Sequence, residues 1–220
     1  MVRIAILGTG AVCRVLLPAF ARLGHEVVVG TRDPAATAAA NPDLIRAAAR
    51  HTGAAPVPFA QAAAGADLVV NAISGPFAVQ ALTPLAEVLR GVVLMDVSSP
   101  FDFTAEDAVL DPANTDSLGE RLQRALPDTP VVKTLNTLAA VVMTAPGLVG
   151  GGDHSVFVSG DDPRAKAVVT GLLEALGWRD VIDLGGIRTA RSTEMMLQAW
   201  LDLSRALSTD FFGFKIVRSG

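Results

Sequence analysis

The sequence predicts a doubly wound α/β fold, with a parallel sheet covered by helices on both faces and a small C-terminal α/β lobe. Two observations lead to this prediction. Short apolar runs alternate with longer segments of helical pattern along the chain, which is typical of a parallel sheet with crossover helices. The runs are apolar almost throughout, as expected for strands buried on both faces. Half of the 220 residues are hydrophobic and 18% are charged, so the chain can bury a sizeable core.

Seven apolar runs are expected to form strands. In chain order they are residues 3–7, 25–29, 67–73, 92–97, 131–137, 155–159 and 181–184. The helices expected between and after them are residues 11–23, 35–50 (interrupted near Asn41 and Pro42), 77–89, 117–126, 161–177 and 189–207. Ser117 and Glu120 have the spacing of a capping box. We expect a nucleotide-binding core over residues 1–137 and a lobe over residues 138–220 that completes a cleft.

A glycine-rich loop, GTGAVC, follows the first expected strand. It matches the dinucleotide-binding pattern G-x-G-x-x-G/A at the two leading positions, and Cys13 is small enough for the third. The N-terminus of the following helix would offer N–H groups to a pyrophosphate. An ordinary βα turn is the alternative, but the strand–loop–helix context favours a Rossmann-type dinucleotide site. The residues expected to contact the dinucleotide are Gly8, Thr9, Gly10, Ala11 and Val12.

The end of the second expected strand indicates which dinucleotide binds. Enzymes that use NAD usually place a carboxylate there to accept from the ribose 2′-hydroxyl. This chain has Gly30, Thr31 and Arg32 instead. A guanidinium pairs with phosphate through two hydrogen bonds, and the hydroxyl groups of Thr31 and Thr9 add donors. We therefore expect NADP(H), with Thr31 and Arg32 at its 2′-phosphate; the alternative is that Arg32 is only a solvated charge.

Other strand ends carry small or polar residues that suit a cofactor cleft. Ligands in open α/β sheets bind at the carboxyl ends of the strands, where such residues leave room for a flat ring. The residues expected there are Asn71, Ala72, Ile73, Ser74, Ser98 and Asn136. The chain has no tyrosine, which excludes a tyrosine acid. His154 is the weak catalytic candidate, since it could polarise a substrate beside the cleft.

Composition and charge argue against several classes of binding partner. The net charge is −4 and the arginines are scattered, which argues against nucleic acid. Cys13 is the single cysteine, so no internal disulfide forms, and no metal-binding spacing occurs. No apolar run has the length of a signal peptide or a membrane span. We expect a cytoplasmic protein that binds no membrane and dimerises through its last helix and tail.

Three long segments carry a family resemblance. They are residues 8–34, beginning GTGAVC; residues 115–137, ending VVKTLNT; and residues 151–178, with DVIDLGG following. Together they resemble the coenzyme F420-dependent NADP oxidoreductases. That resemblance implies a Rossmann fold with a small C-terminal lobe and hydride transfer between NADPH and a deazaflavin. It also implies that Thr9, Thr31 and Arg32 lie at the 2′-phosphate, with Asn71–Ser74 and Asn136 near the nicotinamide.

The identity of the hydride acceptor stays open at this point. The NADP-binding domain of the six-transmembrane metalloreductases is similar too, and there a flavin is the acceptor. Coenzyme F420, FMN and FAD are therefore the second substrates considered. Hydride transfer between two cofactors depends mainly on alignment, so the absence of an obvious acid is no objection. The alternatives are an NADPH-dependent reductase of a small imine or carbonyl compound, and a non-catalytic NADP(H)-binding redox sensor.

Overall fold

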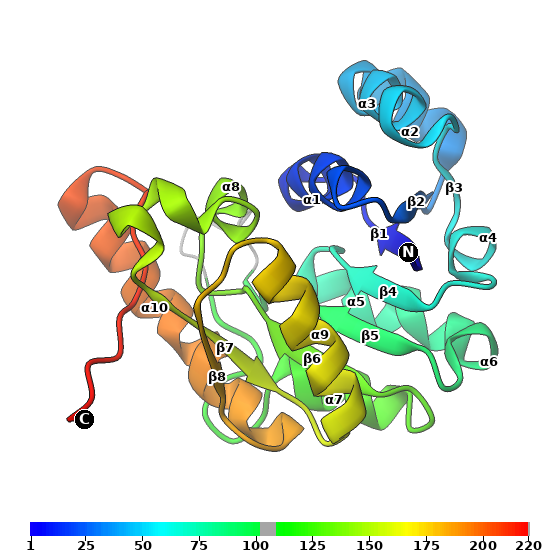
Figure 1. Cartoon of the computed structure of the whole chain (residues 1–220). Helices are drawn as coiled ribbons and strands as arrows, with labels where there is room; N and C mark the ends of the chain where they lie inside the picture. Colours follow the sequence, from blue (N-terminus) through cyan, green and yellow to red (C-terminus); the bar gives the residue numbers. More distant parts are fainter. Residues whose placement is uncertain (102–108, 220) are drawn as a thin grey trace.

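The computed structural model describes residues 1–101 and 109–219 and confirms the α/β class. Eight strands form one sheet in the order β3-β2-β1-β4-β5-β6-β7-β8, with helices on both faces (Figure 1). Neighbouring strands are parallel except β6 and β7, which are antiparallel, so the expectation of a parallel sheet fails at that pair. The connection from β6 to β7 stays at the edge of the sheet where β6 ends, and β7 therefore starts from that edge.

The bounds of most elements lie close to the expected ones. The strands are β1 (Arg3–Leu7), β2 (Glu26–Thr31), β3 (Val57–Pro58), β4 (Leu68–Asn71), β5 (Val93–Asp96), β6 (Val131–Thr134), β7 (Ser155–Ser159) and β8 (Asp180–Asp183). The helices are α1 (Ala11–Arg22), α2 (Pro34–Ala40), α3 (Pro42–Thr52), α4 (Phe59–Ala63), α5 (Gly75–Leu82), α6 (Ala86–Leu89), α7 (Leu118–Ala125), α8 (Ala140–Met143), α9 (Pro163–Ala175) and α10 (Ala190–Leu207).

The differences from expectation have local causes. The sequence did not predict β3, α4 or α8, because two, five and four residues are too few to show a period. The strand expected over residues 131–137 ends at Thr134, since Leu135 has a φ of 60°, which no strand residue adopts. Ser117 caps α7 as its spacing predicted: its hydroxyl accepts from the backbone N–H of Glu120 and donates to the Glu120 carboxylate. The reciprocal bond of a capping box is replaced, because the backbone N–H of Ser117 donates to Asp116.

The sheet packs between two apolar layers, one on each face. On β1, Ile4 and Ile6 face one layer while Ala5 and Leu7 face the other, so the strand is buried on both sides as its composition indicated. Helices α1, α3, α8 and α9 cover the first layer, and α4 to α7 with the start of α10 cover the second. The expected division at residue 137 stays a prediction; β7 and β8, which follow it, continue the same sheet.

Candidate functional site

Two cavities adjoin each other at the carboxyl ends of the parallel strands. The central pocket, of about 500 Å³, lies between the ends of β4, β5 and β6, the start of α1, and α10. The β2 pocket, of about 440 Å³, lies between the glycine loop, the end of β2, α2 and α5. Both are lined by Gly10, Ala72, Ile73 and Ser74. An extended ligand can therefore occupy both pockets across these shared residues.

The glycine loop lies between the two pockets, and its first two glycines have different structural roles. Gly8 has a φ of 122°, and a Cβ on it would lie 2.4 Å from the carbonyl oxygen of Ala72. Among the described residues other than its chain neighbours, none lies within 4 Å of the position where a Cβ on Gly10 would be, so the backbone there is open to a ligand. Cys13, at the third position, is fully buried, and its burial raises the pKa of its thiol to about 12. Cys13 therefore packs the helix and is not a nucleophile.

The β2 pocket gathers groups that suit an anion. The hydroxyl oxygens of Thr31 and Thr37 lie 2.6 Å apart, so one hydrogen bond joins them and one O–H remains free to donate. Arg32 lines the same pocket and is exposed. Across residues 1–101 and 109–219, the Arg32 guanidinium has no carboxylate partner, because neighbouring Asp33 caps α2 by accepting from the N–H of Ala36.

Among the lining residues of the β2 pocket that were not predicted from the sequence, Thr37 and Phe77 could contact a ligand through a hydroxyl and an aromatic ring. Thr37 lies on the alanine-rich α2, where a hydroxyl three residues beyond Pro34 was the available signal. Phe77, on α5, is 57% exposed although it is aromatic, and it forms a wall of this pocket. An exposed ring beside the glycine loop suits stacking against a flat base. Nothing in the sequence distinguishes Phe77 from an ordinary core phenylalanine.

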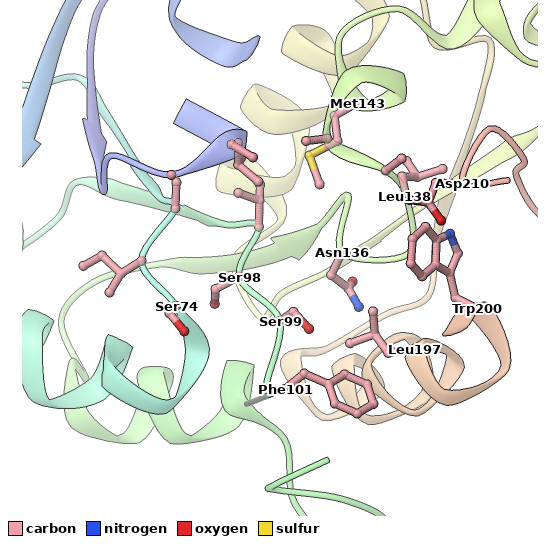
Figure 2. A pocket seen from close by; sticks show the side chains of 18 of the residues that line it. Ser74, Ser98, Ser99, Phe101, Asn136, Leu138, Met143, Leu197, Trp200 and Asp210 are labelled. Carbon is pink, nitrogen blue, oxygen red and sulfur yellow. The ribbon is translucent and has the colours of Figure 1, made fainter. Parts of the chain in front are cut away.

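The central pocket has apolar walls from distant parts of the chain. Figure 2 shows Phe101, Leu138, Met143, Leu197 and Trp200 around it. Two buried polar atoms of lining residues, the Ser99 hydroxyl oxygen and the Trp200 indole nitrogen, have no hydrogen-bond partner in the part of the chain that the structure describes. Neither atom has accessible surface, so neither opens onto the pocket, and the walls that the pocket offers a ligand are mainly apolar.

Beneath the central pocket lies a buried charged cluster that the sequence did not reveal. Lys133 on β6 is 2.9 Å from the carboxylate of Asp96 on β5 and 3.1 Å from that of Glu194 on α10. Burial lowers the pKa of Lys133, but the two carboxylates outweigh it and hold that pKa above its ordinary value. The cluster therefore ties the central strands to α10, which supplies one wall of the pocket.

Asn71 and Ser98 belong to this cluster. The Asn71 amide donates to Asp96 at 2.9 Å and to the Ser98 hydroxyl at 3.2 Å. Asn71 is fully buried and lines neither pocket, so its side chain supports the cleft from below, whereas the sequence led us to expect it near the nicotinamide. Ser98 does line the central pocket.

The remaining predicted site residues separate into two groups. Asn136 lines the central pocket and donates to the carbonyl of Thr193 on α10 at 2.8 Å. Gly8, Thr9, Gly10, Ala11, Val12, Ala72, Ile73 and Ser74 line one or both pockets. His154, in contrast, is buried outside both pockets, with Nε2 3.0 Å from the carbonyl of Pro146 and its ring against Trp178. His154 therefore lies away from the cleft in which it was expected to polarise a substrate.

No group of three or more His, Cys, Asp or Glu side chains is arranged to hold a metal ion within residues 1–101 and 109–219. Over the same stretches, no helix combines the length and hydrophobicity needed to cross a membrane. The described arrangement is a divided cleft at the carboxyl ends of the strands, with Arg32 and two threonine hydroxyls in one half and apolar walls in the other.

The comparisons with known proteins agree with this arrangement. Residues 3–100 match the family described as NADP oxidoreductase, coenzyme F420-dependent. The crystal structure of a candidate F420-dependent NADP reductase from Arthrobacter sp. FB24 is 52% identical over 99% of this chain and 100% of its own, with a TM-score of 0.95. The metalloreductase STEAP3 of Rattus norvegicus is 28% identical over 98% of this chain, which spans only 42% of that protein. An imine reductase from Bacillus cereus BAG3X2, 17% identical over 94% of this chain and 62% of its own, shares the fold with a TM-score of 0.64.

Proposed function

Because the chain belongs to the family of NADP oxidoreductases described as coenzyme F420-dependent, we propose that it transfers a hydride between NADPH and a deazaflavin or flavin bound in the central pocket. Coenzyme F420, FMN and FAD are the acceptors we propose. Membership makes the protein an NADP-dependent oxidoreductase. The proposal adds the acceptor class and the pocket in which the acceptor lies.

The layout of the cleft supports one orientation of NADPH. Its 2′-phosphate would lie in the β2 pocket between Arg32 and the Thr31–Thr37 hydroxyl pair. Its pyrophosphate would cross the glycine loop, where Gly10 leaves the backbone open and α1 begins. The nicotinamide would then lie in the central pocket, because the two pockets meet at these shared residues.

The observation that carries the acceptor class is the apolar lining of the central pocket beside the glycine loop. Its walls include Leu138, Met143, Leu197 and Trp200, and the cavity between them measures about 500 Å³. The family to which the chain belongs is described as coenzyme F420-dependent, and the ring of a deazaflavin or flavin is flat and largely apolar. The apolar walls suit a flat ring.

The role of the protein in this reaction is alignment. When bound, NADPH supplies the hydride, and the reduced acceptor takes its proton from solvent. The chain orients two rings face to face and excludes water between them with Leu138, Met143 and Leu197. Such positioning lowers the barrier without an acid or base.

The experiment that tests this function follows NADPH oxidation at 340 nm with purified protein. Coenzyme F420, FMN and a cyclic imine are supplied in parallel. We expect turnover with F420 or FMN and none above background with the imine. Turnover with the imine alone would overturn the acceptor assignment in favour of a small-molecule reductase. Tight NADPH binding without turnover on any acceptor would favour a redox sensor.

We also propose a homodimer, because apolar side chains stay exposed where α10 meets the tail. Leu203, Leu207 and Phe211 are 38%, 54% and 55% exposed. We expect light scattering to give twice the chain mass, and Leu207→Asp to weaken association by at least about tenfold. Val168→Asp, an equally exposed position on α9, is the control and leaves the mass unchanged. A monomeric wild-type protein at micromolar concentration would refute the dimer.

A further inference from the structure

The Ser98 hydroxyl has a defined direction. It is 5% exposed, donates its hydrogen to the Oδ1 atom of Asp96 and accepts from the amide of Asn71 at 3.2 Å. A hydroxyl has one hydrogen and two lone pairs. With the hydrogen and one lone pair in use, a single lone pair is left for the central pocket, which Ser98 lines. Ser98 can therefore accept from a ligand but has no hydrogen to give it.

The hydrogen bonds around Asp96 fix the direction of the Ser98 hydroxyl. The other carboxylate oxygen, Oδ2, accepts from Lys133 at 2.9 Å, and Lys133 also donates to the carbonyl of Ser98 at 2.6 Å. The backbone N–H of Ser98 donates to Oδ1 of Asp96 at 3.1 Å. A carboxylate paired with an ammonium accepts only. Turning the Ser98 hydrogen toward the pocket would leave this fully buried carboxylate with one donor fewer, which is costly.

The Ser98 lone pair lies in the half of the cleft proposed to hold the nicotinamide. Ser98 follows β5, beside β4 and β6 whose ends line the same pocket, and Figure 2 shows its side chain between Ser74 and Asn136. The carboxamide of nicotinamide carries two N–H donors, which are the groups an acceptor-only hydroxyl would recognise. This reasoning rests on the proposed function, since it requires the nicotinamide to occupy the central pocket.

We propose that Ser98 is a specificity-determining residue that accepts a hydrogen bond from the nicotinamide carboxamide, and that Asp96 and Lys133 are positioning residues that hold its hydroxyl in this direction. We therefore expect the protein to discriminate between dinucleotides that have the same phosphates and riboses and differ only in the substituent on the nicotinamide ring. NADP⁺ can donate from its carboxamide. Its 3-acetylpyridine analogue carries a methyl ketone there, which accepts and cannot donate.

The first test compares the binding of these two dinucleotides by calorimetry. In Ser98→Ala, we expect the Kd for NADP⁺ to rise about three- to tenfold, the effect of one neutral hydrogen bond, while the Kd for the analogue changes less than about twofold. Retained analogue binding also shows that the variant is folded. Ser192→Ala, an exposed serine of α10 outside both pockets, is the matched control and should leave both constants unchanged.

The second test examines the positioning residues through Asp96→Ala. Lys133 keeps Glu194 as its partner in this variant, and the Ser98 hydroxyl loses the carboxylate that accepts its hydrogen. The Ser98 hydrogen is then free to face the pocket. We expect NADP⁺ to bind more weakly and the ketone analogue to bind more tightly, so that the ratio of their Kd values rises at least about threefold. A purely structural role for Asp96 would weaken both dinucleotides equally.

The outcomes separate this inference from the proposed function. Equal losses for both dinucleotides in Ser98→Ala, or an unchanged Kd for NADP⁺, overturn the role of Ser98 while leaving hydride transfer intact. An unchanged ratio in Asp96→Ala overturns the positioning role. If the wild-type protein binds neither dinucleotide, the proposed function and this inference both fail.

Discussion

Replacing Lys133 with methionine is expected to lower the free energy of unfolding by about 3–5 kcal/mol, the usual cost of removing one partner from a buried ion pair. The Lys133 side chain is fully buried, and so are Asp96 and Glu194 to within 1%. Methionine fills a similar volume but leaves two carboxylates without their cation. Urea unfolding followed by circular dichroism measures the change.

The matched control is Lys166→Met. Lys166 pairs with Asp183, whose side chain is 54% exposed, so solvent screens the pair and the loss should stay within about 1 kcal/mol. A loss at Lys133 as small as that at Lys166 would contradict the assignment of the cluster as a structural tie between the sheet and α10.

The Lys133 effect should also persist at alkaline pH. Its pKa in the folded protein lies above 10.5, the ordinary value expected in the unfolded chain. The stabilisation is therefore complete below 10.5 and is lost only as the pH rises through the higher folded-state pKa. The difference between wild type and Lys133→Met should be the same at pH 7 and pH 9. A difference that shrinks between these values would show that the pKa is not raised.

Replacing Arg32 with alanine is expected to weaken NADPH binding by about 1.5–3 kcal/mol, the range for a hydrogen bond to a charged group, or roughly 10- to 150-fold in Kd. The guanidinium is unpaired within the described chain and lines the β2 pocket, so a phosphate would be its main partner. NADH lacks the 2′-phosphate, so its affinity should change little. Fluorescence titration of both dinucleotides measures the two effects.

Arg46→Ala is the control for charge alone. Arg46 is exposed on α3 and pairs with Asp43 outside both pockets, so its removal changes the net charge equally without touching the expected phosphate site. The Arg32 effect should also shrink as salt is raised, because salt screens exposed charges. Unchanged NADPH affinity in Arg32→Ala would remove the basis for preferring NADP(H) over NAD(H) at this site.

Local patterns were enough to predict most of the fold. The near-continuous apolar runs identified the seven longer strands, and the Ser117–Glu120 spacing located the start of α7. Elements of two to five residues, such as β3 and α8, stayed hidden because a period needs more residues to appear. The antiparallel pairing of β7 was also hidden, since the direction of a strand depends on where its connection runs.

Part of the β2 pocket could also be predicted from local sequence patterns. The GTGAVC loop and the Thr31–Arg32 pair are consecutive residues whose meaning depends on their place after a strand. Thr37 and Phe77 reach the same pocket from separate helices, and their contribution appears only once those helices are placed. His154 shows the opposite case: the chain near it suggested the cleft, but its side chain packs against Trp178.

By itself, the sequence of this protein determined the α/β class, the glycine loop and the cation at the end of β2, because each of these depends on neighbouring residues or on local periodicity. Only the tertiary structure brought Lys133, Asp96 and Glu194 together and joined Ser99 to Trp200 in one pocket. Asp96 and Glu194 lie on elements far apart in the chain, and one side chain cannot indicate a partner so distant. The glycine loop and Arg32 of the β2 pocket could therefore be identified from the sequence, whereas the walls of the central pocket depended on the fold.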